Sequence, residues 1–169
     1  MDKQSIFFTC VTAIVATSLM LMAIKFLAKK QNIKPENGQK NSISYTLWII
    51  PIFITFFLFL KVALDLTENS IELIIFSKSK ENAFLEVMQK IAIFIGFAFI
   101  FTFLSNYIVH NLLKLIIGNR IESIEIENEN NGYFILKGIL LISLVYSLLT
   151  IFEHFLKWFM PTIDLPFYH

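Results

Sequence analysis

Four long apolar windows constrain the fold of this chain more than any other feature of its sequence. Residues 4–24, 41–60 and 91–113 contain no Asp, Glu, Lys or Arg, and residues 132–152 contain only Lys137. About 20 apolar residues in a helix cross the roughly 30 Å hydrocarbon core of a bilayer. The sequence therefore predicts an all-α integral membrane protein with four transmembrane helices.

The composition agrees with a membrane protein and argues against several functions. Hydrophobic residues make up 56% of the chain and charged residues 16%, against about 45–50% and about 25% in soluble domains. The net charge of +1 provides no basic field that would attract nucleic acid, so we expect no nucleic-acid partner. Cys10 is the only cysteine, which excludes an internal disulfide and a cysteine-based metal cluster. We expect no cofactor.

The first window is predicted to be a retained helix over residues 5–28. Its apolar region exceeds the usual 7–15 residues of a signal peptide, and no small-x-small cleavage pattern precedes "KFLAKK". The abundance of Ile, Phe, Asn and Lys is associated with AT-rich bacterial genomes. We therefore expect a multi-pass protein of the bacterial cytoplasmic (inner) membrane.

The chain divides into two predicted hairpins and a joint between them. Residues 1–66 form the first transmembrane hairpin, residues 67–90 an interfacial connection with the start of the third helix, and residues 91–169 the second hairpin with a short C-terminal tail. Within the joint, "SIELIIF" (residues 70–76) is too short to span, so it either lies at the interface or packs on the bundle.

The third helix is predicted to begin before its apolar window. In "SKENAFLEVMQK", Ser79 is a candidate N-cap and Glu81 falls in the first turn, where negative charge is favoured. The helix would then run from about residue 80 to residue 117 and extend beyond the bilayer. Gly118 follows at the position where a helix stop is expected. The alternation in the next segment, "IESIEIE", allows a short strand, but a solvated acidic loop is the favoured interpretation.

The two hairpins show a repeated plan. A shift of 88 residues superposes the second half on the first and pairs Ile33 with Ile121, Tyr45 with Tyr133 and Asp65 with Glu153. The matching order of spans and loops predicts a two-helix hairpin duplicated in parallel orientation.

A cluster of lysines after the first window suggests the orientation. Lys25, Lys29, Lys30 and Lys34 follow that window directly, and short cytoplasmic loops carry an excess of Lys and Arg. This favours a cytoplasmic first loop, with both termini outside.

The entry to the fourth window carries a family resemblance. In "IENENNGYFILKG", Ile126, Asn128, Asn130 and Gly138 form an Asn-rich entry followed by an apolar helix with an early glycine. This segment resembles the small bacterial membrane family called domain of unknown function 350. The resemblance implies four spans built as two repeated hairpins, and it implies no particular reaction.

Two predicted spans carry polar side chains on one helical face. In the third span, Asn106 and His110 are four residues apart, with Thr102 one turn earlier; in the fourth, the polar positions are Ser143, Ser147, Thr150 and His154. Such side chains usually hydrogen-bond across helices, so the favoured interpretation is a polar seam that joins the third helix to the fourth. The alternative is a hydrophilic path in which His110 or His154 carries protons or contacts an ion.

Two pairs of opposite charges end the second and fourth spans. Lys61 and Asp65 are four residues apart, as are Glu153 and Lys157, so each pair can close on its own helix surface. The aromatic side chains that follow, Trp158, Phe159 and Tyr168, are typical of a membrane interface. We interpret "EHFLKWF" first as an interfacial anchor and second as a candidate site.

The sequence contains no enzyme signature: no His-Glu-x-x-His pair, no Gly-x-Ser-x-Gly elbow and no glycine-rich phosphate loop. We expect a protein that is not an enzyme, with no catalytic, cofactor-binding or metal site. The favoured function is a non-catalytic membrane subunit or adaptor that associates with its own copies or with a partner's helices, including an immunity-type role. The alternative is a small oligomeric ion or proton channel or transporter.

Overall fold

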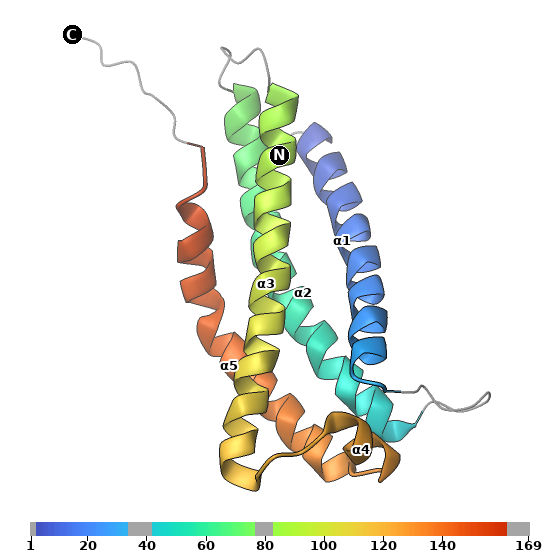
Figure 1. Ribbon diagram of the computed structural model, residues 1–169. Helices are drawn as coiled ribbons and strands as arrows, with labels where there is room; N and C mark the ends of the chain where they lie inside the picture. The colour runs from blue at the N-terminus through green and yellow to red at the C-terminus, as the bar shows by residue number, and fades with distance from the viewer. Residues whose placement is uncertain (1–2, 34–41, 77–82, 162–169) are drawn as a thin grey trace.

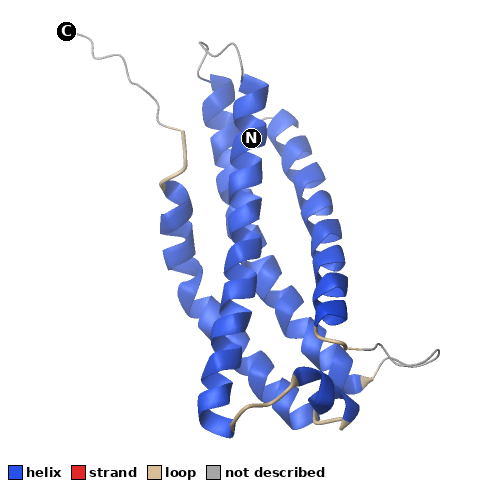
Figure 2. Cartoon of the chain, in the orientation of Figure 1, coloured by secondary structure: helices blue, strands red, loops and turns tan. Residues whose placement is uncertain are grey.

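The computed structural model describes residues 3–33, 42–76 and 83–161, and all of its regular secondary structure in these ranges is helical. The helices are α1 (Lys3–Lys30), α2 (Ile43–Phe76), α3 (Ala83–Ile117), the short α4 (Glu122–Glu127) and α5 (Asn131–Lys157). The four long helices stand side by side, and α4 lies at one end of the bundle (Figures 1 and 2). Each long helix is long and apolar enough to cross a membrane, so the chain is an all-α membrane protein with four spans.

Helices α2 and α3 are longer than a bilayer requires. They contain 34 and 35 residues, so each is about 50 Å long, whereas the hydrocarbon core is about 30 Å thick. The charged residues Lys61, Asp65 and Glu68 lie toward the C-terminal end of α2, and Lys90 lies near the start of α3. The excess length is therefore in the last turns of α2 and the first turns of α3, which project beyond the apolar layer.

The segment "SIELIIF" is the end of α2 and not a separate interfacial element. Ile71 and Ile74 are each only 1% exposed and pack against Val87 of α3, so of the two alternatives for this segment the structure has packing on the bundle. The helix continues past residue 66 because residues 61–76 contain neither Gly nor Pro.

The predicted length of the third helix is close to the observed one. Helix α3 begins at Ala83 and ends at Ile117, and Gly118 follows with a positive φ of 81°, a backbone conformation that glycine adopts without strain. The predicted N-cap Ser79 and first-turn Glu81 lie outside the described residues.

The prediction of a strand or solvated loop in "IESIEIE" is wrong. Residues 122–127 form α4, and its two carboxylates at Glu122 and Glu125 are each only 6% exposed. Ile121 and Ile124 are instead 57% and 47% exposed. The usual orientation is reversed because both carboxylates have charged or amide partners inside the protein.

Aromatic rings fill the core between α2, α3 and α5. Phe56, Phe59 and Phe152 have no exposed surface, and the ring of Phe152 lies 4.7 Å from that of Phe59 and 4.8 Å from that of Phe101. Lipid tails are as apolar as these rings, so close van der Waals packing, and not removal from water, holds the helices together here. The interior of the single chain is closed at this level.

Helices α2 and α5 cross in close contact at Gly138. A Cβ atom on Gly138 would lie 2.7 Å from Cγ of Pro51, so only glycine allows this approach. Near the start of both helices, the Ser44 hydroxyl donates to Oδ1 of Asn131 at 2.7 Å. The two helices therefore run in the same direction and touch at matching depths.

The helix boundaries follow the predicted repeat. The shift of 88 residues carries Ile43, the first residue of α2, onto Asn131, the first residue of α5. It also carries Lys30, the last residue of α1, onto Gly118, which directly follows α3. In the described residues, α1 with α2 and α3 with α5 are therefore two equivalent hairpins in parallel orientation.

Candidate functional site

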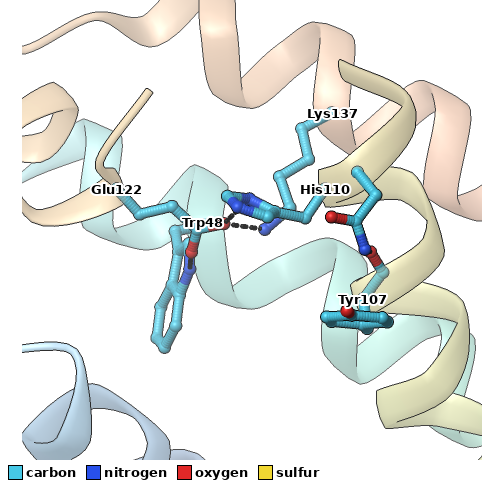
Figure 3. A network of polar contacts seen from close by, with 6 residues as sticks. Trp48, Tyr107, His110, Glu122 and Lys137 are labelled. Carbon is cyan, nitrogen blue, oxygen red and sulfur yellow. Dashed lines mark hydrogen bonds and ion pairs between the residues drawn. The ribbon is translucent and has the colours of Figure 1, made fainter. Parts of the chain in front are cut away.

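A buried ionic cluster lies at the end of the bundle where α4 closes it. The Glu122 side chain is 5% exposed, and its Oε1 lies 2.5 Å from Nζ of Lys137, which is also 5% exposed. Its Oε2 accepts a hydrogen bond from Nε1 of Trp48 at 2.7 Å. Figure 3 shows these side chains meeting from α2, α4 and α5. We call Glu122, Lys137, Trp48 and His110 the Glu122 cluster.

His110 connects this cluster to α3. Its Nδ1 lies 3.2 Å from Oε1 of Glu122, within ion-pair distance when the ring is protonated. The approach is not aligned as a hydrogen bond, and Nδ1 has no other partner. The His110 side chain is 32% exposed, so it stands between the buried carboxylate and the outside of the bundle. Side chains from three helices, α2, α3 and α5, therefore meet at one carboxylate of α4.

The electrostatics of the cluster favour an ionised Glu122. Burial by itself raises the pKa of Glu122. The charge and hydrogen bond of Lys137, together with the hydrogen bond of Trp48, lower the pKa by more than burial raises it, so the pKa lies below the ordinary 4.5. The carboxylate and the Lys137 ammonium then neutralise each other. Loss of either partner would leave an uncompensated charge inside the protein.

A second acidic group joins α4 to the start of α5. Glu125 accepts from Nδ2 of Asn130 at 2.5 Å and pairs with Nη1 of Arg120 at 3.0 Å. The Asn130 hydrogen bond is the largest cause that lowers the pKa of Glu125. Asn130 also caps α5, because its Oδ1 accepts from the backbone N–H of Tyr133 at 3.3 Å. The Asn-rich entry thus fixes α4 against α5.

A cleft of about 420 Å³ lies beside the Glu122 cluster, between α1 and α3. We call it the polar cleft. Its polar side chains come from the turn after α1, from α3 and from the entry to α4, and they are Gln31, Asn106, Tyr107, His110, Asn119, Arg120, Glu122 and Ser123. Among the 11 lining residues, Leu27 and Phe103 provide apolar surface. The cleft therefore combines hydrogen-bonding groups with apolar walls.

The two predicted polar faces do not meet within the chain. Asn106 is buried and borders the polar cleft, and Thr102 is buried with its hydroxyl donating to the Ala98 carbonyl at 2.7 Å. The polar side chains of α5 instead lie on its exposed side, where the Ser147 hydroxyl donates to the Ser143 carbonyl at 3.0 Å. We call the exposed residues Ser143, Ser147, Thr150 and His154 the outer face of α5.

The two predicted charge pairs differ. Glu153 and Lys157 form an ion pair at 2.6 Å, with both side chains more than 40% exposed. Lys61 and Asp65 are both exposed on α2, and no ion pair joins them in the described part of the chain. Trp158 is 80% exposed after α5, as an interfacial side chain would be. Tyr168 lies outside the described residues.

Sequence reasoning missed Glu122, Trp48 and Lys137 as a set. Lys137 was the available signal, because a lone lysine within an apolar window needs a partner. Its partner lies in a segment that was assigned to solvent, so the pair was not recognised.

No metal site emerges from the described side chains: within residues 3–33, 42–76 and 83–161, no group of three or more His, Cys, Asp or Glu residues could hold an ion. Comparison of the chain with protein families, curated proteins and solved structures finds no match. The resemblance to domain of unknown function 350 therefore stays a prediction.

Proposed function

We propose that the protein is a non-catalytic membrane subunit that works by associating with other membrane helices, foremost those of its own copies. The observation that carries this proposal concerns the outer face of α5, which is polar and exposed. The repeat makes this face equivalent to a face of α2 that is buried inside the chain. Ser and Thr hydroxyls on a membrane helix favour contacts with neighbouring helices.

Equivalent residues of α2 and α5 show the difference directly. Thr55 and Phe59 of α2 have no exposed surface, and the Phe59 ring contacts Phe101 of α3 and Phe152 of α5. The repeat places Ser143 and Ser147 at the positions of Thr55 and Phe59, and both serines are exposed. The face of α5 that is equivalent to the packing face of α2 is thus exposed.

The converse holds for the face of α5 that packs on α2. Gly138 and Val145 are buried in this contact region, whereas their equivalents Ile50 and Phe57 on α2 are 46% and 45% exposed. Helices α2 and α5 therefore contact each other through faces that are not equivalent under the repeat, as in a head-to-tail interface. Each helix leaves exposed the face that its equivalent helix uses in this contact, so the exposed face of α2 can pack on the exposed face of α5.

A second copy can place its α2 on the outer face of α5 in the same direction, at a wider separation than the internal crossing, because an isoleucine takes the place of Gly138 there. The Pro51–Gly138 contact then becomes a contact between Ile139 of one copy and Ile50 of the next, and these residues are 59% and 46% exposed. Head-to-tail contacts of this kind build rings or filaments.

The test is the number of copies that assemble in lipid, counted by single-molecule photobleaching of the full chain in nanodiscs. The wild type is expected to form assemblies of two or more copies. Ser147→Trp, which places a large side chain on the outer face of α5, is expected to shift the chain to single copies. Leu104→Trp is the matched control, because Leu104 is 47% exposed on α3 away from this face. Equal assembly of both variants, or a wild type that is monomeric throughout, would refute the proposal.

A small oligomeric channel is the second candidate, favoured by the hydroxyl groups along the outer face of α5. The aromatic core closes the interior of a single chain, so a path would have to run between copies. Ion flux into vesicles that contain the wild type, and no flux with Ser147→Trp, would support the channel. Assembly of the wild type without ion flux would support the non-catalytic subunit.

We also propose the bacterial cytoplasmic membrane as the location, with the Glu122 cluster at the cytoplasmic end. The support is the basic side chains at this end of the bundle, where Lys29, Lys30 and Lys114 are all exposed.

A further inference from the structure

The polar cleft lies where lipid head groups meet acyl chains. It is formed by the last turns of α1 and α3 and closed by the entry to α4. Lys29 and Lys30 of α1 and Lys114 of α3 are exposed at the same helix ends, and basic side chains at span ends mark the head-group level. Leu27 and Phe103 line the cleft with apolar surface. A ligand that is polar at one end and apolar at the other fits these walls.

The polar groups of the cleft include atoms that make no hydrogen bond within the protein. Oε1 of Gln31, Oδ1 of Asn106 and Nδ1 of His110 are buried without a hydrogen bond, and Asn106 is only 8% exposed. A buried polar atom left unpaired is costly, and such a group usually has a partner. The unpaired amide oxygens are acceptors, as is the adjoining Glu122 carboxylate. The ligand must therefore bring hydrogen-bond donors.

Arg120 adds a donor at the rim of the same cleft. Its side chain is 46% exposed, and its Nη1 is paired with Glu125. A guanidinium has five N–H donors, and its planar fork suits phosphate. The rim can thus donate to a phosphate while the interior accepts from an ammonium.

The charges around the cleft favour one class of lipid head group over others. Glu122 is neutralised by Lys137, and Arg120 is paired with Glu125. The residues that line the cleft therefore leave no surplus positive charge for an anionic head group and no surplus negative charge for a free cation, since Lys29, Lys30 and Lys114 lie outside the lining. A zwitterion that carries both a phosphate and an ammonium satisfies both ends.

We propose that the polar cleft binds the head group of a phosphatidylethanolamine. The ammonium donates to the amide oxygens of Gln31 and Asn106, the phosphate accepts from Arg120, and an acyl chain lies along Leu27 and Phe103. This lipid site is on the α1–α3 side of the bundle and does not involve the outer face of α5, so it stands independently of the proposed self-association.

The test compares phosphatidylethanolamine with phosphatidylcholine of the same acyl chains, because the choline ammonium is fully methylated and has no N–H donor. Lipid retained by the purified full chain is counted by native mass spectrometry. Each lost hydrogen bond should weaken binding about fivefold, so at least this preference for phosphatidylethanolamine is expected. Equal retention of the two lipids would overturn the proposal.

Two variants and a soluble probe locate the site and identify its ligand. Asn106→Leu and Gln31→Leu should each reduce the preference, while Thr150→Val on the outer face of α5 should keep it. Gln31 is half-buried at the edge of the cleft, so its variant decides the matter if Asn106→Leu does not insert. A preference unchanged in Gln31→Leu would contradict the assignment. Displacement of the lipid by an equal concentration of glycerophosphoethanolamine would assign the cleft to a soluble head group and overturn the lipid proposal.

Discussion

Replacement of Glu122 by Gln is expected to destabilise the protein by about 3–5 kcal/mol, because it leaves the Lys137 ammonium buried without its counter-charge. The two side chains are each only 5% exposed, so water cannot replace the lost carboxylate. The measurement is thermal unfolding of the purified protein in one detergent. The control is Glu153→Gln, which breaks an exposed pair with Lys157 worth about 0–1 kcal/mol.

A double variant distinguishes the loss of a charge from a loss of shape. Glu122→Gln combined with Lys137→Met removes both charges, and we expect it to recover much of the stability lost in Glu122→Gln. The folded-state pKa of Glu122 is below the ordinary 4.5, so its contribution is present above that ordinary pKa and is lost as pH falls through the lowered value. If the Glu122→Gln and Glu153→Gln variants are equally stable, the Glu122 cluster does not have the stabilising role assigned to it.

Gly138→Ala is expected to cost about 1–3 kcal/mol, because its Cβ would lie 2.7 Å from Cγ of the rigid Pro51 ring. Helices α2 and α5 would have to separate at their crossing. Gly96→Ala is the matched control on α3: nothing lies within 4 Å of a Cβ there, and alanine favours a helix by up to about 1 kcal/mol. Both variants are compared by the same unfolding measurement.

Removing the clash should restore the crossing. Pro51→Ala in the Gly138→Ala background deletes the ring atom that the new methyl group meets, so stability should return in part. If Gly138→Ala and Gly96→Ala behave alike, α2 and α5 do not cross where the structure places them.

The spans were predictable because each one is a continuous run of apolar residues in the sequence. Charge-free windows and the length of a bilayer fix them. A candidate N-cap at Ser79 and a first-turn Glu81 extended the predicted third helix close to the observed start of α3 at Ala83. The reversed orientation of α4 was not predictable. Glutamates in an alternating segment are normally assigned to water, and the partners of Glu122 are distant in sequence, at Lys137 and Trp48.

The direction of each polar face was also beyond the sequence. Ser143, Ser147 and His154 were recognised as one face of a helix, but they were expected to meet α3. Inside a bilayer, core-facing and lipid-facing positions are equally apolar, so periodicity shows that a face exists and not what it touches. The packing of α2 with α5, set by Gly138 and Pro51, decides that this face lies outside the chain.

The most direct test of head-to-tail association is a disulfide between copies. With Cys10 replaced by Ala, one tagged copy carries Ile139→Cys and a differently tagged copy carries Ile50→Cys, and both are oxidised in the membrane. A disulfide requires Cα atoms within about 7 Å, and cysteine, which is smaller than the isoleucine it replaces at both positions, lets the two helices approach this closely. We expect a cross-link between the two tags and none between two Ile139→Cys copies. Cross-linking of Ile50→Cys to Leu104→Cys with equal efficiency, or no cross-link at Ile139, would contradict the association.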